Sequence, residues 1–295
     1  MLSILIPAYN YNVYPLVAEL DKQCLDCGIE FEISCQDDAS LSIWNTENEK
    51  INSNPNCHFY INSTNLGRGN NINSLAEKSK FDWLLIMDCD TFPTQNNFIK
   101  KYCEIIPKSH VVFGGIQYKK EKPEKEKLLR WVYGNIRESL SVTTRNERPN
   151  GHALTSNLLI QKEIFLQNRF DSDIINYGYE DLCFLSTLET KQIKVSHIDN
   201  PTFHLNLETS IIFLEKTKIA IENLSIITNS CKYLNIESKI NSAYITLKKL
   251  KLVAIIALIF NKTESKITSN LVSKNPSLFL FDLYKLGYYC RIKSK

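Results

Sequence analysis

The apolar positions of the first 90 residues alternate between two spacings. Short apolar runs bounded by turn residues predict buried β-strands, and they fall at 3–7, 31–35, 57–61 and 83–87. Between the first two runs, the i, i+3, i+4, i+7 spacing of a helix is carried by Val13, Leu16, Val17, Leu20 and Cys24. A second helix is expected at about 70–79. Strand, helix and strand in this order predict a parallel, Rossmann-like sheet.

The polar loops of this half directly follow predicted strands. They lie at 8–11, 37–40, 65–70 and 88–92. The carboxyl ends of parallel strands meet at one edge of a sheet, where open α/β folds bind ligands. We therefore expect the functional site at this edge.

The second half continues with mixed elements up to about residue 210. The pattern predicts a helix near 96–106, a strand Val111–Ile116, a strand near 156–160 and a short strand at 193–198. A helix is also expected directly after Gly178–Asp181, with Leu182, Leu185 and Leu188 on one face. Together these elements predict an α/β fold with a mixed, Rossmann-like sheet flanked by helices.

The C-terminal part is mainly helical in pattern and strongly basic. Residues 215–295 hold 14 Lys and Arg against 5 Asp and Glu, a net charge of +9, which leaves −6 for residues 1–214. The longest apolar run, at 252–260, is flanked by lysines and is far shorter than the roughly 20 residues that span a bilayer. Two interpretations stay open for the helix at 248–262, a buried core helix or one that lies on an anionic membrane surface.

Composition limits the class of protein and its compartment. With 295 residues and 43% hydrophobic content, the chain can bury a substantial core. Nine cysteines at irregular spacings argue for a reducing compartment, and Cys24 and Cys27 form a lone CxxC whose simplest role is packing. The first residues lack the basic region and long apolar run of a signal peptide, so we expect a cytoplasmic protein. The basic tail contains no nucleic-acid-binding motif, and no nucleic-acid partner is expected.

Two carboxylates one residue apart end the fourth predicted strand. Asp88 and Asp90 would repel each other unless a cation lay between them, and oxygen ligands suit Mg²⁺ or Mn²⁺. These carboxylates favour a metal ion that bridges to a phosphate, and the alternative interpretation is an ordinary solvated turn. A second Asp-x-Asp, at Asp171 and Asp173, has no predicted strand in front of it, and this difference in context favours the first pair.

Other loops at the same edge carry compatible groups. Asp38 can accept hydrogen bonds from a base or ribose, and Arg68, among glycines, can approach phosphates. Neither GxGxxG after the first strand nor GxxxxGK[ST] is present, which disfavours dinucleotide and P-loop chemistry. Glu180 and Asp181 lie at a predicted helix N-terminus, where acids also serve simply to complement the helix dipole.

Six of these motifs, in this order, resemble glycosyltransferase family 2, the inverting GT-A enzymes. They are Ile4–Asn10, Asp37–Ser40, Asn65–Arg68, Asp88–Asp90, Gly178–Asp181 and His204. The resemblance covers roughly residues 1–210 and implies a GT-A catalytic domain there, with a nucleotide-sugar-binding half at 1–95 and an acceptor-binding half at 96–210. Residues 211–295 would be a helical basic extension.

The resemblance also implies roles for individual residues. The donor would be a nucleotide-sugar, usually a UDP-sugar, with a divalent cation on its diphosphate. Donor-binding positions would be Pro7, Tyr9, Asn10, Asp38, Asn65, Gly67, Arg68, Asp88 and Cys89. The metal, Mn²⁺ or Mg²⁺, would be held by Asp90, His204 and Asp88. Asp181 would deprotonate the acceptor hydroxyl, and Tyr179 and Glu180 would contact the acceptor.

The chain departs from the family pattern at two places. Ser156-Asn157 stands where small residues are common, and no Gln-x-x-Arg-Trp follows Asp181. Lys127–Trp131 is a near match that lacks the Gln and precedes the acceptor motif. Without that motif or membrane spans, we expect transfer of one sugar per encounter to a saccharide or lipid-linked saccharide in surface polysaccharide synthesis. The oligomeric state is open.

Two rival functions remain at this point. A sugar nucleotidyltransferase would share the sheet and metal but would carry a glycine-rich, Lys-containing loop after the first strand, where Ala8–Tyr11 stands instead. A catalytically degenerate member could serve as a nucleotide-sugar-binding partner in a polysaccharide assembly complex.

Overall fold

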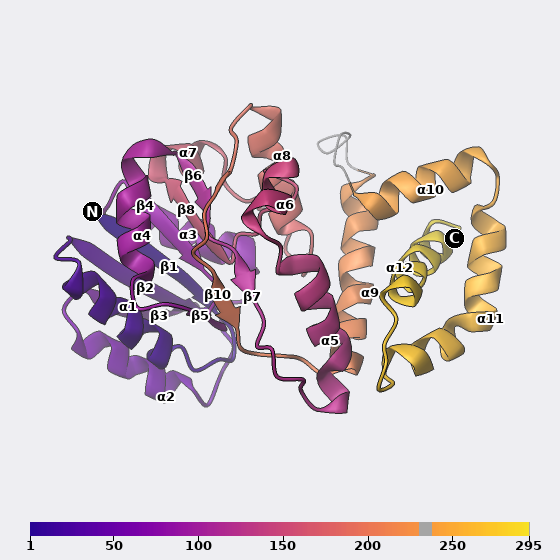
Figure 1. The fold of residues 1–295 in the computed structure, drawn as a ribbon, viewed down its shortest axis with the longest axis horizontal. Coiled ribbons are helices and arrows are strands. Elements are labelled where there is room, and N and C mark those ends of the chain that lie inside the picture. The colour runs from indigo at the N-terminus through magenta and orange to yellow at the C-terminus, as the bar shows by residue number, and fades with distance from the viewer. Residues whose placement is uncertain (230–237, 295) are drawn as a thin grey trace.

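The computed structural model describes residues 1–229 and 238–294. A central sheet with helices on both faces occupies one end of the molecule and a group of four helices the other (Figure 1). The expected α/β architecture and helical C-terminal region are confirmed, apart from the stretch of that region that lies outside the described residues.

The seven-stranded sheet has the order β3-β2-β1-β4-β8-β6-β9. Its strands are β1 (Leu2–Ala8), β2 (Phe31–Asp37), β3 (Cys57–Ile61), β4 (Trp83–Met87), β6 (Val111–Phe113), β8 (Asn157–Gln161) and β9 (Ser196–His197). β1 to β4 are parallel, whereas β8 runs antiparallel to both β4 and β6. Because β1 and β4 are buried on both faces, they are almost entirely apolar, with Ser3 as the exception, which is why the sequence predicted them well.

Two apolar layers cover the faces of this sheet. One is formed with α1 (Tyr14–Asp26) and α4 (Phe98–Ile105), and the other with α3 (Arg68–Lys78), α7 (Lys162–Gln167) and α8 (Glu180–Thr190). α2 (Asn45–Asn48) and a 3₁₀ turn, Glu49–Ser53, connect β2 to β3. The predicted helical spacing of α1 is confirmed, since Leu16, Val17 and Leu20 are buried.

A small second sheet corrects three sequence-based expectations. It contains β5 (Thr91–Pro93), β10 (Thr202–His204) and β7 (Ile116–Gln117) in the order β5-β10-β7. The single strand expected at 111–116 is therefore two strands in different sheets. The break lies at Gly114 and Gly115, the latter with φ of +105°, a conformation that side-chain-bearing residues rarely adopt. The loop expected at 88–92 passes into β5, and His204 lies within a strand.

The middle of the chain adds helices beside these sheets. They are α5 (Leu128–Tyr133), which follows the 3₁₀ turn Lys125–Lys127 and continues into a π-helical turn, Gly134–Glu138, and α6 (Val142–Glu147). α5 and α8 lie between the sheet and the C-terminal helices (Figure 1).

Within residues 210–229 and 238–294, four helices form the C-terminal group, with α12 at its centre (Figure 1). They are α9 (Ser210–Ile227), α10 (Lys239–Lys249), α11 (Val253–Leu271) and α12 (Leu278–Lys293). Their shared core includes Phe260, Tyr284 and Tyr289 and reaches Leu129 of α5. The helix expected at 248–262 is interrupted, because Lys251 has φ of +59° between α10 and α11. No helix of the described residues is long and apolar enough to cross a membrane.

Candidate functional site

The loops after β1, β2 and β4 meet at one sheet edge, as predicted. Ala8 pairs with Asp37 in register, and the Asp38 amide donates to the Ala8 carbonyl across 2.9 Å. The Asp88 amide donates to the Ser156 carbonyl, which brings the end of β4 beside the loop that enters β8. This register places the donor-side candidates together.

Asp38 organises the loop that leads into α3. Its buried carboxylate accepts hydrogen bonds from the amides of Leu66 and Gly67, both at 2.9 Å, and from Asn62 Nδ2. Gly67 has φ of +79°, and a Cβ there would lie 2.7 Å from the Ile175 carbonyl oxygen. Only glycine fits this turn, which delivers Arg68 to the first position of α3. A contact of Asp38 with base or ribose stays a prediction.

The remaining donor-side positions surround this loop. Pro7 is buried in β1, whereas Tyr9 is 59% exposed at the sheet edge. Asn10 has a left-handed backbone, and its Oδ1 accepts a hydrogen bond from Ser42 Oγ. Asn65 Oδ1 accepts from the amide of Gly67 across 3.0 Å. Burial raises the pKa of the Cys89 thiol, so this group is neutral at ordinary pH.

The guanidinium of Arg68 joins the donor edge to the helix that carries Asp181. Its Nε and Nη2 lie 3.0 and 2.5 Å from Asp88 Oδ1, and its Nη1 lies 2.8 Å from Asp181 Oδ1 and 2.9 Å from Thr155 Oγ1. Burial alone would lower the pKa of Arg68, but the two carboxylates outweigh it and raise that pKa. Asp88, predicted to share the metal, is therefore turned toward Arg68.

Asp181 and Glu180 occupy different surroundings at the N-terminus of α8. Asp181 accepts hydrogen bonds from Thr155 Oγ1 at 2.5 Å and from the Thr155 amide at 3.3 Å. Glu180 Oε2 is buried without a hydrogen-bond partner among the described residues. Burial, followed by repulsion from Asp181, raises the pKa of Glu180 to about 7. The helix begins after Tyr179, whose φ of +70° is a rare backbone conformation that concentrates at functional sites.

Asp90 and His204 are brought together by the small sheet. Thr91 of β5 pairs with His204 of β10, and the Leu205 amide donates to the Asp90 carbonyl. Asp90 Oδ2 and His204 Nε2 consequently lie 3.6 Å apart. Burial raises the pKa of Asp90 to about 6 and lowers that of His204 to about 4, so the imidazole is neutral near pH 7.

These two side chains fit a hard divalent cation. Within residues 1–229 and 238–294, no three His, Cys, Asp or Glu side chains converge on a closed metal cage. Mg²⁺-like ions are, however, commonly held by one or two protein ligands together with substrate phosphates. His204 Nδ1 is buried with no hydrogen-bond partner in the described structure, and its neutral ring is a competent ligand.

Three further residues belong to this site, and sequence reasoning missed their roles. Thr155 binds both Arg68 and Asp181. The Tyr118 ring stacks on His204 with a centroid separation of 5.3 Å, and the Arg130 guanidinium lies 5.2 Å from the Tyr118 ring. Arg130 belongs to the near match at 127–131, which was the available signal. Neither Tyr118 nor Thr155 carried one.

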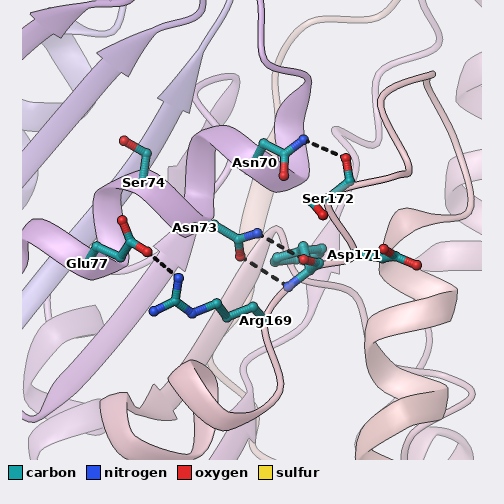
Figure 2. A pocket seen from close by; sticks show the side chains of 8 residues that line it. Asn70, Asn73, Ser74, Glu77, Arg169, Asp171 and Ser172 are labelled. Atoms are coloured by element: carbon teal, nitrogen blue, oxygen red, sulfur yellow. Dashed lines mark hydrogen bonds and ion pairs between the residues drawn. The ribbon is translucent and has the colours of Figure 1, made fainter.

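The second Asp-x-Asp lies in a different setting. Figure 2 shows its loop held against α3, where Asn73 exchanges two hydrogen bonds with the backbone of Phe170 and Arg169 pairs with Glu77. The Asp173 amide donates to Asp171 Oδ1 across 3.2 Å. The loop lines a polar hollow of about 490 Å³, and no strand directly precedes this loop. Its structure is that of a local turn.

Comparisons with known proteins identify a sequence family and a shared fold. The sequence profile described as glycosyl transferase family 2 matches residues 3–167. S. aureus TarS has a TM-score of 0.55 at 17% identity over 99% of this chain and 55% of that chain. TarS 1-349 in complex with UDP-GlcNAc has a TM-score of 0.52 at 16% identity over 99% and 91% of the two chains.

A third solved structure comes from a different enzyme. The mannosyltransferase PcManGT from Pyrobaculum calidifontis, in complex with GDP-Man and Mn²⁺, has a TM-score of 0.54 at 11% identity over 97% of this chain and 86% of that chain. At such low identities these structural likenesses show the fold alone. No curated protein matches the sequence.

Proposed function

The chain belongs to glycosyl transferase family 2 and is a glycosyltransferase, and from that premise we propose a metal-dependent, inverting enzyme that moves one sugar per encounter. The donor is a nucleotide-sugar, with UDP as the nucleotide, and the acceptor is a saccharide or lipid-linked saccharide in surface polysaccharide synthesis. The observation that carries this proposal is Arg68, which links Asp88 at the donor edge to Asp181.

The donor side has the chemistry of a diphosphate site. Arg68 stands at the first position of α3, where free backbone amides and the helix dipole favour an anion. The exposed ring of Tyr9 can stack on a base. The structurally similar enzymes bound to UDP-GlcNAc and GDP-Man support a nucleotide-sugar as donor.

Asp90 and His204 would hold the divalent cation, Mn²⁺ or Mg²⁺. When bound, such an ion would neutralise negative charge on the leaving diphosphate. Arg130 lies close enough to both side chains to lower their pKa values, and its own charge is paired with Glu138 Oε2 across 3.0 Å.

The acceptor step belongs to α8. The acceptor oxygen attacks the anomeric carbon from the face opposite the diphosphate, so a new carbon–oxygen bond forms as the bond to the diphosphate breaks and its electron pair leaves with the phosphate. Asp181 takes the acceptor proton. Tyr179 and Glu180 lie at the same helix end and would orient acceptor hydroxyls. Inversion follows from attack on the opposite face.

The C-terminal helices support peripheral attachment to an anionic membrane, where a lipid-linked acceptor would be found. On α11, Ile255, Leu258 and Ile259 are more than half exposed, while Ala257 and Phe260 on the same helix are buried. Lysines flank this apolar stripe at 248, 249, 251 and 262. An apolar stripe bordered by lysines matches the chemistry of an interfacial helix.

The proposed function is tested first on the donor. Melting temperatures would be measured with UDP-, GDP- and dTDP-sugars, each with and without Mn²⁺. A shift with a UDP-sugar that depends on Mn²⁺ supports the proposal. A melting-temperature shift with a GDP- or dTDP-sugar instead would show that the donor nucleotide is not UDP. A shift of the same size with and without Mn²⁺ would reject the proposed metal dependence. Transfer to a saccharide or lipid-linked acceptor is then sought with the donor that binds.

A further inference from the structure

A second cleft, of about 620 Å³, lies between α8 and the C-terminal helices. Its lining residues come from the segments around α5, α6 and α8 on one side and from α10 and α12 on the other. A cleft of this size is in the range that binds small molecules. Tyr179, the residue directly before Glu180 and Asp181, is one of its lining residues.

Apolar side chains line both sides of the cleft. Ile136, Leu140, Leu182 and Leu185 form an apolar wall on the α8 side, and Ile240 and Leu286 come from α10 and α12. Leu182 and Leu185 lie one helical turn apart on α8, so the apolar wall extends from the helix that carries the proposed base. This surface suits a hydrocarbon chain.

The cleft also contains a group of positively charged side chains around the carboxylate of Asp282. Arg137 Nη2 and Lys285 Nζ each lie 2.8 Å from an oxygen of Asp282. Lys239 also lines the cleft and is close enough to affect Lys285. The cleft holds four Lys and Arg in total, including Arg148, against Asp282 and Glu189. Two cations therefore share the carboxylate of Asp282, and a third, Lys239, lines the same cleft.

The partly buried ammonium of Lys285 shares the carboxylate of Asp282 with Arg137. Burial lowers its pKa; the hydrogen bond to Asp282 opposes that effect, and repulsion from Arg137 and Lys239 adds to it. Its side chain is 17% exposed and packs over the Phe281 ring. A bound anion would supply the missing negative charge.

We propose that this cleft binds an amphiphile whose phosphate or diphosphate lies among Lys239, Lys285 and Arg137 and whose apolar chain runs along Leu182 and Leu185. Its use as the acceptor's site rests on the proposed glycosyl transfer; the binding itself does not. The occupant would then place a lipid-linked saccharide beside Tyr179 and the proposed base.

The test uses three probes on the full chain, without any sugar donor. They are farnesyl diphosphate, inorganic diphosphate and farnesol, titrated by calorimetry below the critical micelle concentration. Farnesyl diphosphate should bind at least about tenfold more tightly than either of the others, because only this probe has both a diphosphate and an apolar chain. Equal binding of inorganic diphosphate would overturn the amphiphile and leave a plain anion site. Equal binding of farnesol would leave an apolar one.

Variants and competition locate the binding. Lys239→Gln, an exposed change at the start of α10, should weaken farnesyl diphosphate binding by about tenfold, as expected for loss of a charged hydrogen bond. The matched control is Lys274→Gln, an exposed lysine outside the cleft, which should bind normally. Leu140→Ser tests the apolar wall. Equal affinities in all variants, or displacement of the probe by UDP with Mn²⁺, would place the ligand elsewhere and overturn the proposal.

The result is separable from the proposed function. Probe binding that depends on Lys239, in a chain that transfers no sugar, would keep the cleft and reject the acceptor role. Normal transfer by Lys239→Gln to a lipid-linked acceptor, together with normal probe binding, would reject the cleft and keep the enzyme.

Discussion

Arg68 Nη1 lies 2.8 Å from Asp181 Oδ1, so one guanidinium holds a carboxylate that is 113 residues away in the sequence. The Asp181 oxygen that binds Arg68 is not free to accept a proton from an acceptor hydroxyl. A donor diphosphate would compete for the same guanidinium, because phosphate oxygens accept the same forked hydrogen bonds. Donor binding would thus release Asp181 to act as a base.

Arg68→Lys tests this relationship. Lysine keeps the charge but cannot bind Asp88 and Asp181 at once, so donor affinity should fall about tenfold or more. The melting temperature should also fall, because two partly buried carboxylates lose hydrogen bonds. The measurement is UDP affinity with Mn²⁺ beside a thermal melt. Arg169→Lys, in the exposed pair with Glu77, is the control and should change neither. Unaltered UDP affinity in Arg68→Lys would detach this residue from the donor.

Asp90→Ala tests the proposed metal site. The change should abolish turnover and most Mn²⁺-dependent UDP affinity, because His204 alone is a weak site for a hard cation. Removing a buried carboxylate whose pKa is raised should leave the fold intact. Asp173→Ala, in the second Asp-x-Asp, is the control and should have little effect. If Asp90→Ala retained metal-dependent UDP binding, the cation would have to be held elsewhere.

Glu180 should give the protein a measurable pH dependence. Its pKa in the fold, about 7, lies above the model-compound value of 4.5. The folded state therefore binds the proton more tightly than the unfolded chain, so this group's contribution to stability is complete below about pH 4.5 and is lost as pH rises through about 7. Glu180→Gln removes that loss.

The melting temperatures of the wild type and Glu180→Gln should be compared from pH 5 to pH 8. The advantage of the variant should widen as pH rises, by roughly 2 °C or more. The difference between the two curves removes the contributions of Asp90 and His204 to the pH dependence, because both residues titrate in both proteins. Parallel curves would mean that Glu180 is solvated in the fold.

The sequence predicted β1 and β4 with nearly correct ends because both strands are buried on both faces and are almost entirely apolar. It could not predict that Asp90 and His204 meet. Their contact depends on β5 and β10, two strands of three residues whose pairing joins positions more than 100 residues apart. Such short strands carry almost no periodic signal.

The contacts of Arg68 show that the sequence identifies motifs but not which of their side chains pair. The motif containing Arg68 and the motif containing Asp181 were both identified, and the family is confirmed by its profile. Nothing in either motif says that the two side chains pair, or that Thr155 binds both. The break of the strand expected at 111–116 was in principle visible in Gly114-Gly115. Glycine inside a strand often marks a bulge or a tight bend, so this pair is a sequence signal for a break in the strand.

Membrane attachment is tested by charge reversal. The double variant Lys248→Glu, Lys249→Glu should lose most of its co-sedimentation with anionic liposomes at low salt, since each basic residue near the surface contributes roughly 1 kcal/mol. Binding of the wild type should weaken as salt rises. Lys119→Glu, Lys120→Glu reverses two exposed charges outside the C-terminal helices and should bind like the wild type. A wild type that stays in the supernatant with anionic vesicles at low salt would refute the attachment.

Asp181→Asn separates an inverting transferase from a nucleotide binder. Asparagine keeps the shape of the side chain and an oxygen for Arg68 and Thr155, but it cannot take the acceptor proton, and loss of a general base typically lowers the rate by about 10²–10⁴. UDP affinity should survive, because the donor contacts are made by other residues. Both quantities should be measured in one preparation, together with the anomeric configuration of the product.

Glu180→Gln is the control for that experiment, since Glu180 lies next to Asp181 but has different surroundings. It should reduce the transfer rate far less, because it removes an orienting group and leaves the base in place. If Glu180→Gln proved the more damaging change, the buried, unpaired carboxylate would be the base and Asp181 a positioning residue that holds Arg68. Near-normal transfer by Asp181→Asn would contradict the proposed role of Asp181 as the base. A product that retains the donor's configuration would contradict attack from the face opposite the diphosphate.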